Sequence, residues 1–201
     1  MVVDFTALPT RDAYRWLIST ITPRPIAWVS TISPEGVTNL APFSFFNGVT
    51  ANPPTLMFVP VNNREGAPKD TVRNIEATRE MVVNIVSADL AEAMNATAAM
   101  LPPEQSEFEH VGIEAAPSTR VKPPRVAAAR VAFECTLHSI VKIGEGPAAA
   151  NVVFASIVCA HVSDTVLDGE GRVDPAKLDT IGRMGGESYV HTRQRFDLTR
   201  P

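Results

Sequence analysis

A lysine and a threonine at the predicted start of a helix are suited to binding an anion. Lys69, Asp70 and Thr71 open the segment KDTVRNIEATRE, in which Val72 and Ile75 recur at near-helical spacing. The first turn of a helix offers backbone N–H groups without acceptors and the positive end of the helix dipole. Together with an ammonium and a hydroxyl, these groups could bind a phosphate. Considered alone, the segment is better explained by a solvated first turn, because charged first turns are common.

A second candidate site is a pair of segments predicted to form a hairpin, RPIAWVST (24–31) and NLAPFSFFN (39–47). Pro42 lacks a backbone donor, so the second segment cannot be a fully paired central strand. Three phenylalanines surround Ser44, and unpaired backbone groups between aromatic walls could hold a flat heteroaromatic ring. An edge strand with a Phe-rich core explains this pattern equally well.

A third candidate is RMGGESYVHTR (183–193) near the end of the chain. Its two glycines allow close approach of the backbone, and Tyr189 could stack on a ring or form a hydrogen bond. A turn anchored by one aromatic residue is the alternative. None of the three segments decides the function alone.

The elements that must position these residues are mainly strands. Apolar, β-branched runs and turn residues predict six strands, and a helical period with suitable start signals predicts three helices. We interpret the stretch 104–124, rich in acids and prolines, as an irregular functional loop. Six strands with few helices indicate a mainly β barrel with peripheral helices. The expected strands are 26–32, 37–46, 55–61, 81–86, 129–143 and 151–164, and the expected helices are 10–19, from 68 onward, and 88–100.

Composition narrows the class of protein. The 201 residues suit a single domain, 1–201. The net charge of −4 and the absence of a Lys/Arg run argue against binding of nucleic acid, which requires clustered positive charge. No apolar stretch approaches a membrane span and no signal peptide is evident, so we predict a cytoplasmic protein. The four histidines and two cysteines show no zinc-site spacing, and we therefore predict no metal and two reduced thiols.

The order of the motifs along the chain adds more than any one of them. From about Tyr14 to Phe196 the chain resembles the flavin reductase-like family of FMN-binding split barrels, in the branch that includes flavoredoxin. The segments that carry the resemblance are TPRPIAWVST (22–31), N-x-APFSFFN (39–47), NPP (52–54), KDT-x-x-NI (69–75), VVNI (82–85), FECTL (133–137) and GGESY (185–189).

The resemblance implies a six-stranded antiparallel split barrel that forms a homodimer and holds FMN near the dimer interface. It places two hydroxyls by the FMN tail, the second hairpin segment along the isoalloxazine and ribityl groups, a lysine and a threonine on the phosphate, and a tyrosine over the pocket. It leaves Asp70 to cap the helix. The implied FMN residues are Ser30, Thr31, Asn39, Ala41, Pro42, Phe43, Ser44, Phe46, Asn47, Lys69, Asp70, Thr71 and Tyr189.

The implied activity is electron transfer from NADH or NADPH to FMN, with an electron-transfer or monooxygenase protein as a possible partner. One departure concerns the Gly-Asp-His signature of reductases that serve a monooxygenase, because the corresponding segment is GPAAANVVF (146–154) and contains no histidine. This leaves open a tightly bound FMN that carries electrons to a partner. A split barrel for haem or pyridoxal phosphate ranks last, since no histidine in the hairpin pair could ligate haem.

Overall fold

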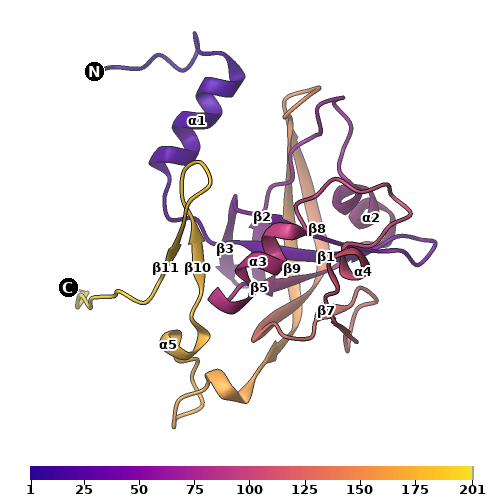
Figure 1. The fold of residues 1–201 in the computed structure, drawn as a ribbon, viewed down its shortest axis with the longest axis vertical. Coiled ribbons are helices and arrows are strands. Elements are labelled where there is room, and N and C mark those ends of the chain that lie inside the picture. The colour runs from indigo at the N-terminus through magenta and orange to yellow at the C-terminus, as the bar shows by residue number, and fades with distance from the viewer. Residues whose placement is uncertain (201) are drawn as a thin grey trace.

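A curved antiparallel sheet of seven strands forms the centre of the molecule (Figure 1). The structure is a computed structural model, and it describes residues 1–200. The strand order is β2-β1-β5-β8-β9-β4-β3, and the two ends of this sheet, β2 and β3, share no ladder, so the barrel is not closed. The strands are β1 (Ala27–Ile32), β2 (Thr38–Phe43), β3 (Phe46–Ala51), β4 (Pro54–Phe58), β5 (Glu80–Ile85), β8 (Val131–Ile143) and β9 (Ala150–Val162).

The main sheet has seven strands, one more than the six predicted. The segment 37–46, expected as a single return strand, ends as β2 at Phe43, and after a bend at Ser44 the chain begins β3 at Phe46. Strand β3 pairs only with β4, and five of its six residues are exposed. A strand without a buried face has no alternation of apolar and polar residues, so its sequence gave no strand pattern.

The predicted helices 10–19 and from 68 onward correspond to α1 and α2. The helix expected over 88–100 is shorter, and the loop expected over 104–124 contains α4. No helix within residues 1–200 combines the length and the hydropathy needed to cross a membrane. The helices are α1 (Thr10–Thr20), α2 (Asp70–Thr78), η1 (Ala88–Leu90), α3 (Ala91–Ala96), α4 (Glu107–Val111), η2 (Asp164–Val166) and α5 (Pro175–Leu178).

Two small antiparallel sheets complete the fold. One joins β6 (Ala115–Ala116) to β7 (Arg125–Val126), and the other joins β10 (Ile181–Arg183) to β11 (Tyr189–His191). The hairpin of β10 and β11 lies beside α1, on the opposite side of the molecule from α2 (Figure 1). The buried Arg24 connects the end of α1 to the β10–β11 hairpin. Its guanidinium donates to the carbonyls of Ile18 and Ile21 at the end of α1 and of Met184 after β10.

The sheet curls around one apolar core and is covered on part of its other face. The inner core takes side chains from β1, β2, β4, β5, β8, β9 and α2, with Phe58 and Ile75 fully buried. On the outer face of β1, Trp28 packs against α3 and α4 residues and donates from Nε1 to the hydroxyl of Thr97 at 2.9 Å. Both faces of β1 are therefore buried, which explains its continuous apolar sequence.

Candidate functional site

The predicted helix start lies at the rim of a cavity. Helix α2 begins at Asp70, with Lys69 at the N-cap position and no side chain capping the helix. Asp70 does not cap the helix as expected; its carboxylate pairs instead with Arg73, one turn along the helix. The ammonium of Lys69 lies 5.7 Å from the ring centroid of Phe43. The N–H of Val72 donates to the carbonyl of Lys69 at 2.9 Å, whereas those of Asp70 and Thr71 have no acceptor within the helix and remain available for a ligand.

A cavity of about 370 Å³ lies between the start of α2, strand β2 and the chain after α3. Residues 97–101 form another part of its wall, and Glu107 of α4 contributes as well. Six of the residues predicted to bind FMN line this one cavity: Asn39, Ala41, Pro42, Lys69, Asp70 and Thr71. Segments separated by 30 residues of sequence are thus brought to one place.

Asn39, one of the residues in this wall, is the centre of a buried hydrogen-bond network. Its Oδ1 accepts from the hydroxyls of Thr71 at 2.8 Å and Thr31 at 3.3 Å. Its Nδ2 donates to both carboxylate oxygens of Glu107, at 3.0 and 2.9 Å, and the backbone N–H of Leu40 donates to the same carboxylate at 2.8 Å. The network fixes β2, α2 and α4 relative to one another.

Glu107 is a site residue that sequence reasoning missed. It lies in the stretch 104–124, and no motif or periodicity distinguishes it from the neighbouring acids. In the structure Glu107 is only 6% exposed. Burial raises the pKa of this carboxyl above its ordinary value, although the N–H of Leu40 and the amide of Asn39 act in the opposite direction.

The raised pKa of Glu107 predicts how stability depends on pH. The folded protein binds this proton more tightly than the unfolded chain, so the free energy of unfolding should fall as pH rises from the ordinary value of 4.5 through the raised pKa. Glu107→Gln should remove that part of the slope. Chemical denaturation across this range measures it, with Glu109→Gln, an exposed acid on the same helix, as the control. Equal slopes for both variants would contradict the assignment.

Ser30 and Thr31 are fully buried and lie outside the described cavity wall. The hydroxyl of Ser30 donates to the carbonyl of Pro124. The hydroxyl of Thr31 bonds Asn39 and accepts from the Nδ2 of Asn74 at 3.1 Å. Both hydroxyls are therefore engaged within the protein, behind the residues that face the cavity.

The remaining predicted residues of the hairpin lie around the bend between β2 and β3. Phe43 packs into the inner core, with its ring centroid 5.6 Å from that of Phe58. Ser44 accepts from the guanidinium of Arg24 at 3.3 Å. Phe46 is half-buried against the inner core, whereas Asn47 is exposed on β3.

Tyr189 lies apart from the cavity of Lys69. It lines a separate cavity together with Asp89 and His191, and its ring lies under the guanidinium of Arg183 at 4.4 Å. Its hydroxyl donates to the Oδ1 of Asn95 on α3 at 3.1 Å. Tyr189 is thus linked to the helix that precedes the cavity segment 97–101.

Comparison with known proteins identifies the family. The family profile described as "Flavin reductase like domain" matches residues 19–179, which is most of the chain. The chain belongs to the flavin reductase-like family. This membership confirms the resemblance found in the sequence, the mainly β split-barrel fold class and a flavin-related oxidoreductase function.

Three similar proteins show how far the similarity to this chain extends. A protein of Aquifex aeolicus is 43% identical over 177 residues, which are 88% of each chain. The solved structure of nitrilotriacetate monooxygenase component B from Bacillus cereus is 33% identical, covers 98% of each chain and has a TM-score of 0.93. That of 2-nitrobenzoate 2-nitroreductase from Pseudomonas fluorescens is 32% identical, covers 100% of this chain and 96% of that chain, and has a TM-score of 0.90.

Proposed function

We propose that this flavin reductase-like protein binds FMN, with the phosphate at the start of α2. The observation that carries the proposal is the single cavity that brings together Lys69, Thr71, Asn39 and the backbone of β2. An ammonium and the N–H groups of a helix start are donors that suit a phosphate. The hydroxyl of Thr71 donates to Asn39 in this structure, and it would have to exchange that bond to reach the phosphate. Lys69 and the start of α2 line the same cavity as Ala41 and Pro42, which form an apolar part of its wall.

Apart from the exposed carboxylate of Glu65, the charges that line the cavity are compatible with an anionic ligand at Lys69. Asp70 is neutralised by its pair with Arg73, and the carboxylate of Glu107 is occupied by Asn39 and Leu40. Within residues 1–200, Lys69 forms no ion pair with a carboxylate. Its charge is therefore available to a phosphate. The buried hydroxyls of Ser30 and Thr31 support the wall from behind in this proposal.

The flavin ring would follow β2 toward Ser44, Phe46 and Asn47. Strand β2 is an edge strand, so part of its backbone N–H and C=O groups point away from β1 and can bond a heteroaromatic edge. FMN, when bound, supplies the transfer of electrons, and the protein supplies orientation and hydrogen bonds. Tyr189 would not contact the flavin in this proposal. Its hydrogen bond to Asn95 would hold α3 in place and thereby position residues 97–101 in the cavity wall.

We further propose a homodimer and a nicotinamide donor. The exposed edge strand β3 includes Val49, which is 48% exposed, and exposed apolar side chains also stand at Val141 and Ile143 on β8. A second copy covering this face would enclose the flavin ring beside Asn47.

The electron donor in this proposal is NADH or NADPH. The similarity to a monooxygenase component B supports a monooxygenase as the partner that receives the electrons.

A second candidate function is an FMN electron carrier. The segment GPAAANVVF (146–154), which spans the end of the β8–β9 turn and the start of β9, contains no histidine to assist a nicotinamide. Such a carrier would keep FMN bound and receive its electrons from a partner protein. The two functions differ in whether a pyridine nucleotide reduces the bound flavin.

Rapid mixing of the FMN-loaded protein with NADH or NADPH tests the proposal. A reductase should lose its visible flavin absorbance with at least one of the two donors, at a rate that increases with donor concentration. Bound flavin that stays oxidised with both donors, yet bleaches with dithionite, would overturn the reductase proposal and favour the carrier.

A further inference from the structure

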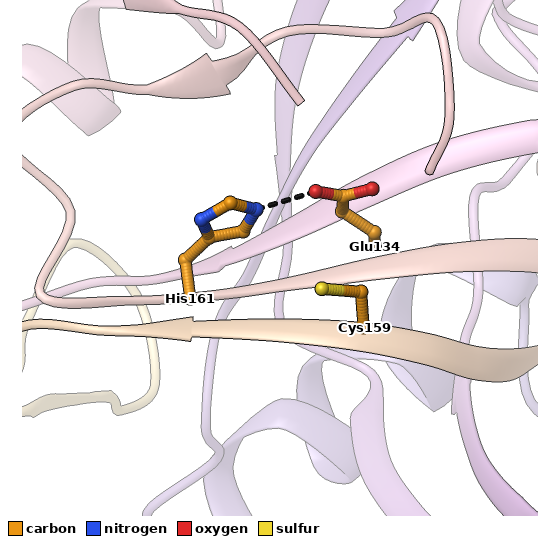
Figure 2. Close-up of side chains that lie close together, drawn as sticks. All are labelled: Glu134, Cys159 and His161. Carbon is orange, nitrogen blue, oxygen red and sulfur yellow. Dashed lines mark hydrogen bonds and ion pairs between the residues drawn. The ribbon is translucent and has the colours of Figure 1, made fainter. Parts of the chain in front are cut away.

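Three metal-ligating side chains meet on the sheet face opposite the inner core, far along the chain from the cavity residues. Glu134 on β8 and Cys159 and His161 on β9 lie side by side (Figure 2). Their ligand atoms, one carboxylate oxygen, one Sγ and one imidazole nitrogen, all lie within 4.8 Å of one another. In Figure 2 the sulfur of Cys159 points toward the space between the imidazole and the carboxylate.

A β-bulge in β9 assembles this group. Cys135 pairs with Ile157, whereas the preceding residue, Glu134, pairs with Cys159, so β9 has one extra residue at this point. Without the bulge, Cys159 and His161 would share the face of Ile157, which packs against the inner core. The bulge turns both side chains to the face of Glu134, and bulges often re-aim side chains at functional positions.

We propose that Glu134, Cys159 and His161 bind one Zn²⁺ ion, with water as the fourth ligand. A thiolate, an imidazole and a carboxylate are the donor types of zinc sites with three protein ligands. Bond lengths of about 2.0–2.3 Å place the donors of a tetrahedral zinc ion about 3.5 Å apart, so small side-chain rotations suffice. The side chain of His161 is 27% exposed, which gives the ion a path from solvent.

The surroundings of Glu134 are compatible with this role. The carboxylate is fully buried and accepts backbone N–H groups from Thr119 at 2.7 Å, Arg120 at 2.5 Å and Val121 at 3.1 Å. These bonds fix its orientation as outer-shell contacts do for metal-bound carboxylates. The imidazole of His161 contacts the same carboxylate, and zinc would take the place of the proton between them. The ion would thereby fasten segment 119–121 to β9.

Zinc retention by the full-length, FMN-loaded protein tests the site. The protein is stripped with a chelator, kept reduced, and dialysed against buffered free Zn²⁺, after which zinc and FMN per chain are measured. Cys159→Ser removes the thiolate, and His161→Gln removes the imidazole while keeping a donor toward Glu134. His138→Ala, an exposed histidine on β8, is the matched control.

The wild-type protein and His138→Ala should retain one zinc ion per chain, while each ligand variant should bind zinc at least about tenfold more weakly. Absence of zinc from the wild-type protein, or retention of zinc by Cys159→Ser and His161→Gln equal to that of the wild-type protein, would overturn the site. FMN content, measured in the same samples, shows that the variants are folded. It also keeps the outcome separate from the proposed flavin function.

Discussion

Replacing Lys69 with alanine should weaken FMN binding by about 10- to 150-fold. The change removes the ammonium at the start of α2, and a hydrogen bond to a charged group contributes about 1.5–3 kcal/mol, which corresponds to this range of dissociation constants. Lys69 is exposed at the cavity rim and packs into no core, so the fold should remain intact. Titration of the apoprotein with FMN, followed by flavin fluorescence, measures the effect.

The controls separate the phosphate from the rest of FMN. Lys122→Ala removes an exposed lysine elsewhere on the surface and should leave FMN affinity unchanged. Riboflavin lacks the phosphate, so Lys69→Ala should change riboflavin binding much less than FMN binding. The loss with FMN should also shrink as salt is added, because the cavity is open to solvent. An unchanged FMN affinity in Lys69→Ala would remove the phosphate assignment.

Glu107→Ala should lower the free energy of unfolding by about 2–4 kcal/mol, because the substitution leaves buried donors without an acceptor. The amide of Asn39 and the N–H of Leu40 both lose the carboxylate. Since Asn39 also bonds Thr71, the start of α2 should lose its fixed position, and FMN affinity should fall as well. Chemical denaturation of the FMN-free protein gives the stability, and FMN titration gives the affinity.

Glu109 provides a matched control for Glu107. It lies on the same short helix, α4, and is exposed. Glu109→Ala should change the free energy of unfolding by no more than about 0.5 kcal/mol, as is usual for surface substitutions. If the two alanine variants were equally stable, the network around Asn39 would contribute little to the fold.

Much of the fold was predictable from local patterns in the sequence. The helix start at Lys69 and Asp70, the turn at Gly36 with a φ of +92°, and the two long strands β8 and β9 follow from helix-start, turn and periodicity signals. Strand β3 escaped prediction because all of its residues after Phe46 are exposed and it carries no apolar alternation. The helix α4 escaped because it is short and lies among acids and prolines.

The candidate site was only partly predictable, since its hydrogen bonds connect distant parts of the chain. Asn39, Lys69 and Thr71 carried a signal through their motifs, and the structure brings them to one cavity. Glu107 carried none, because its role depends on α4 packing against β2 68 residues away in sequence. The grouping of Glu134 with His161 likewise depends on a β-bulge, which spacing along one strand does not predict.

Direct titration of the purified protein with FMN tests the central claim, that the cavity at the start of α2 holds this nucleotide. The account predicts saturable uptake with one FMN per chain, a perturbed visible flavin spectrum, and tighter binding of FMN than of riboflavin. A protein that is purified without flavin, takes up no FMN on addition, or binds riboflavin as tightly as FMN would contradict it.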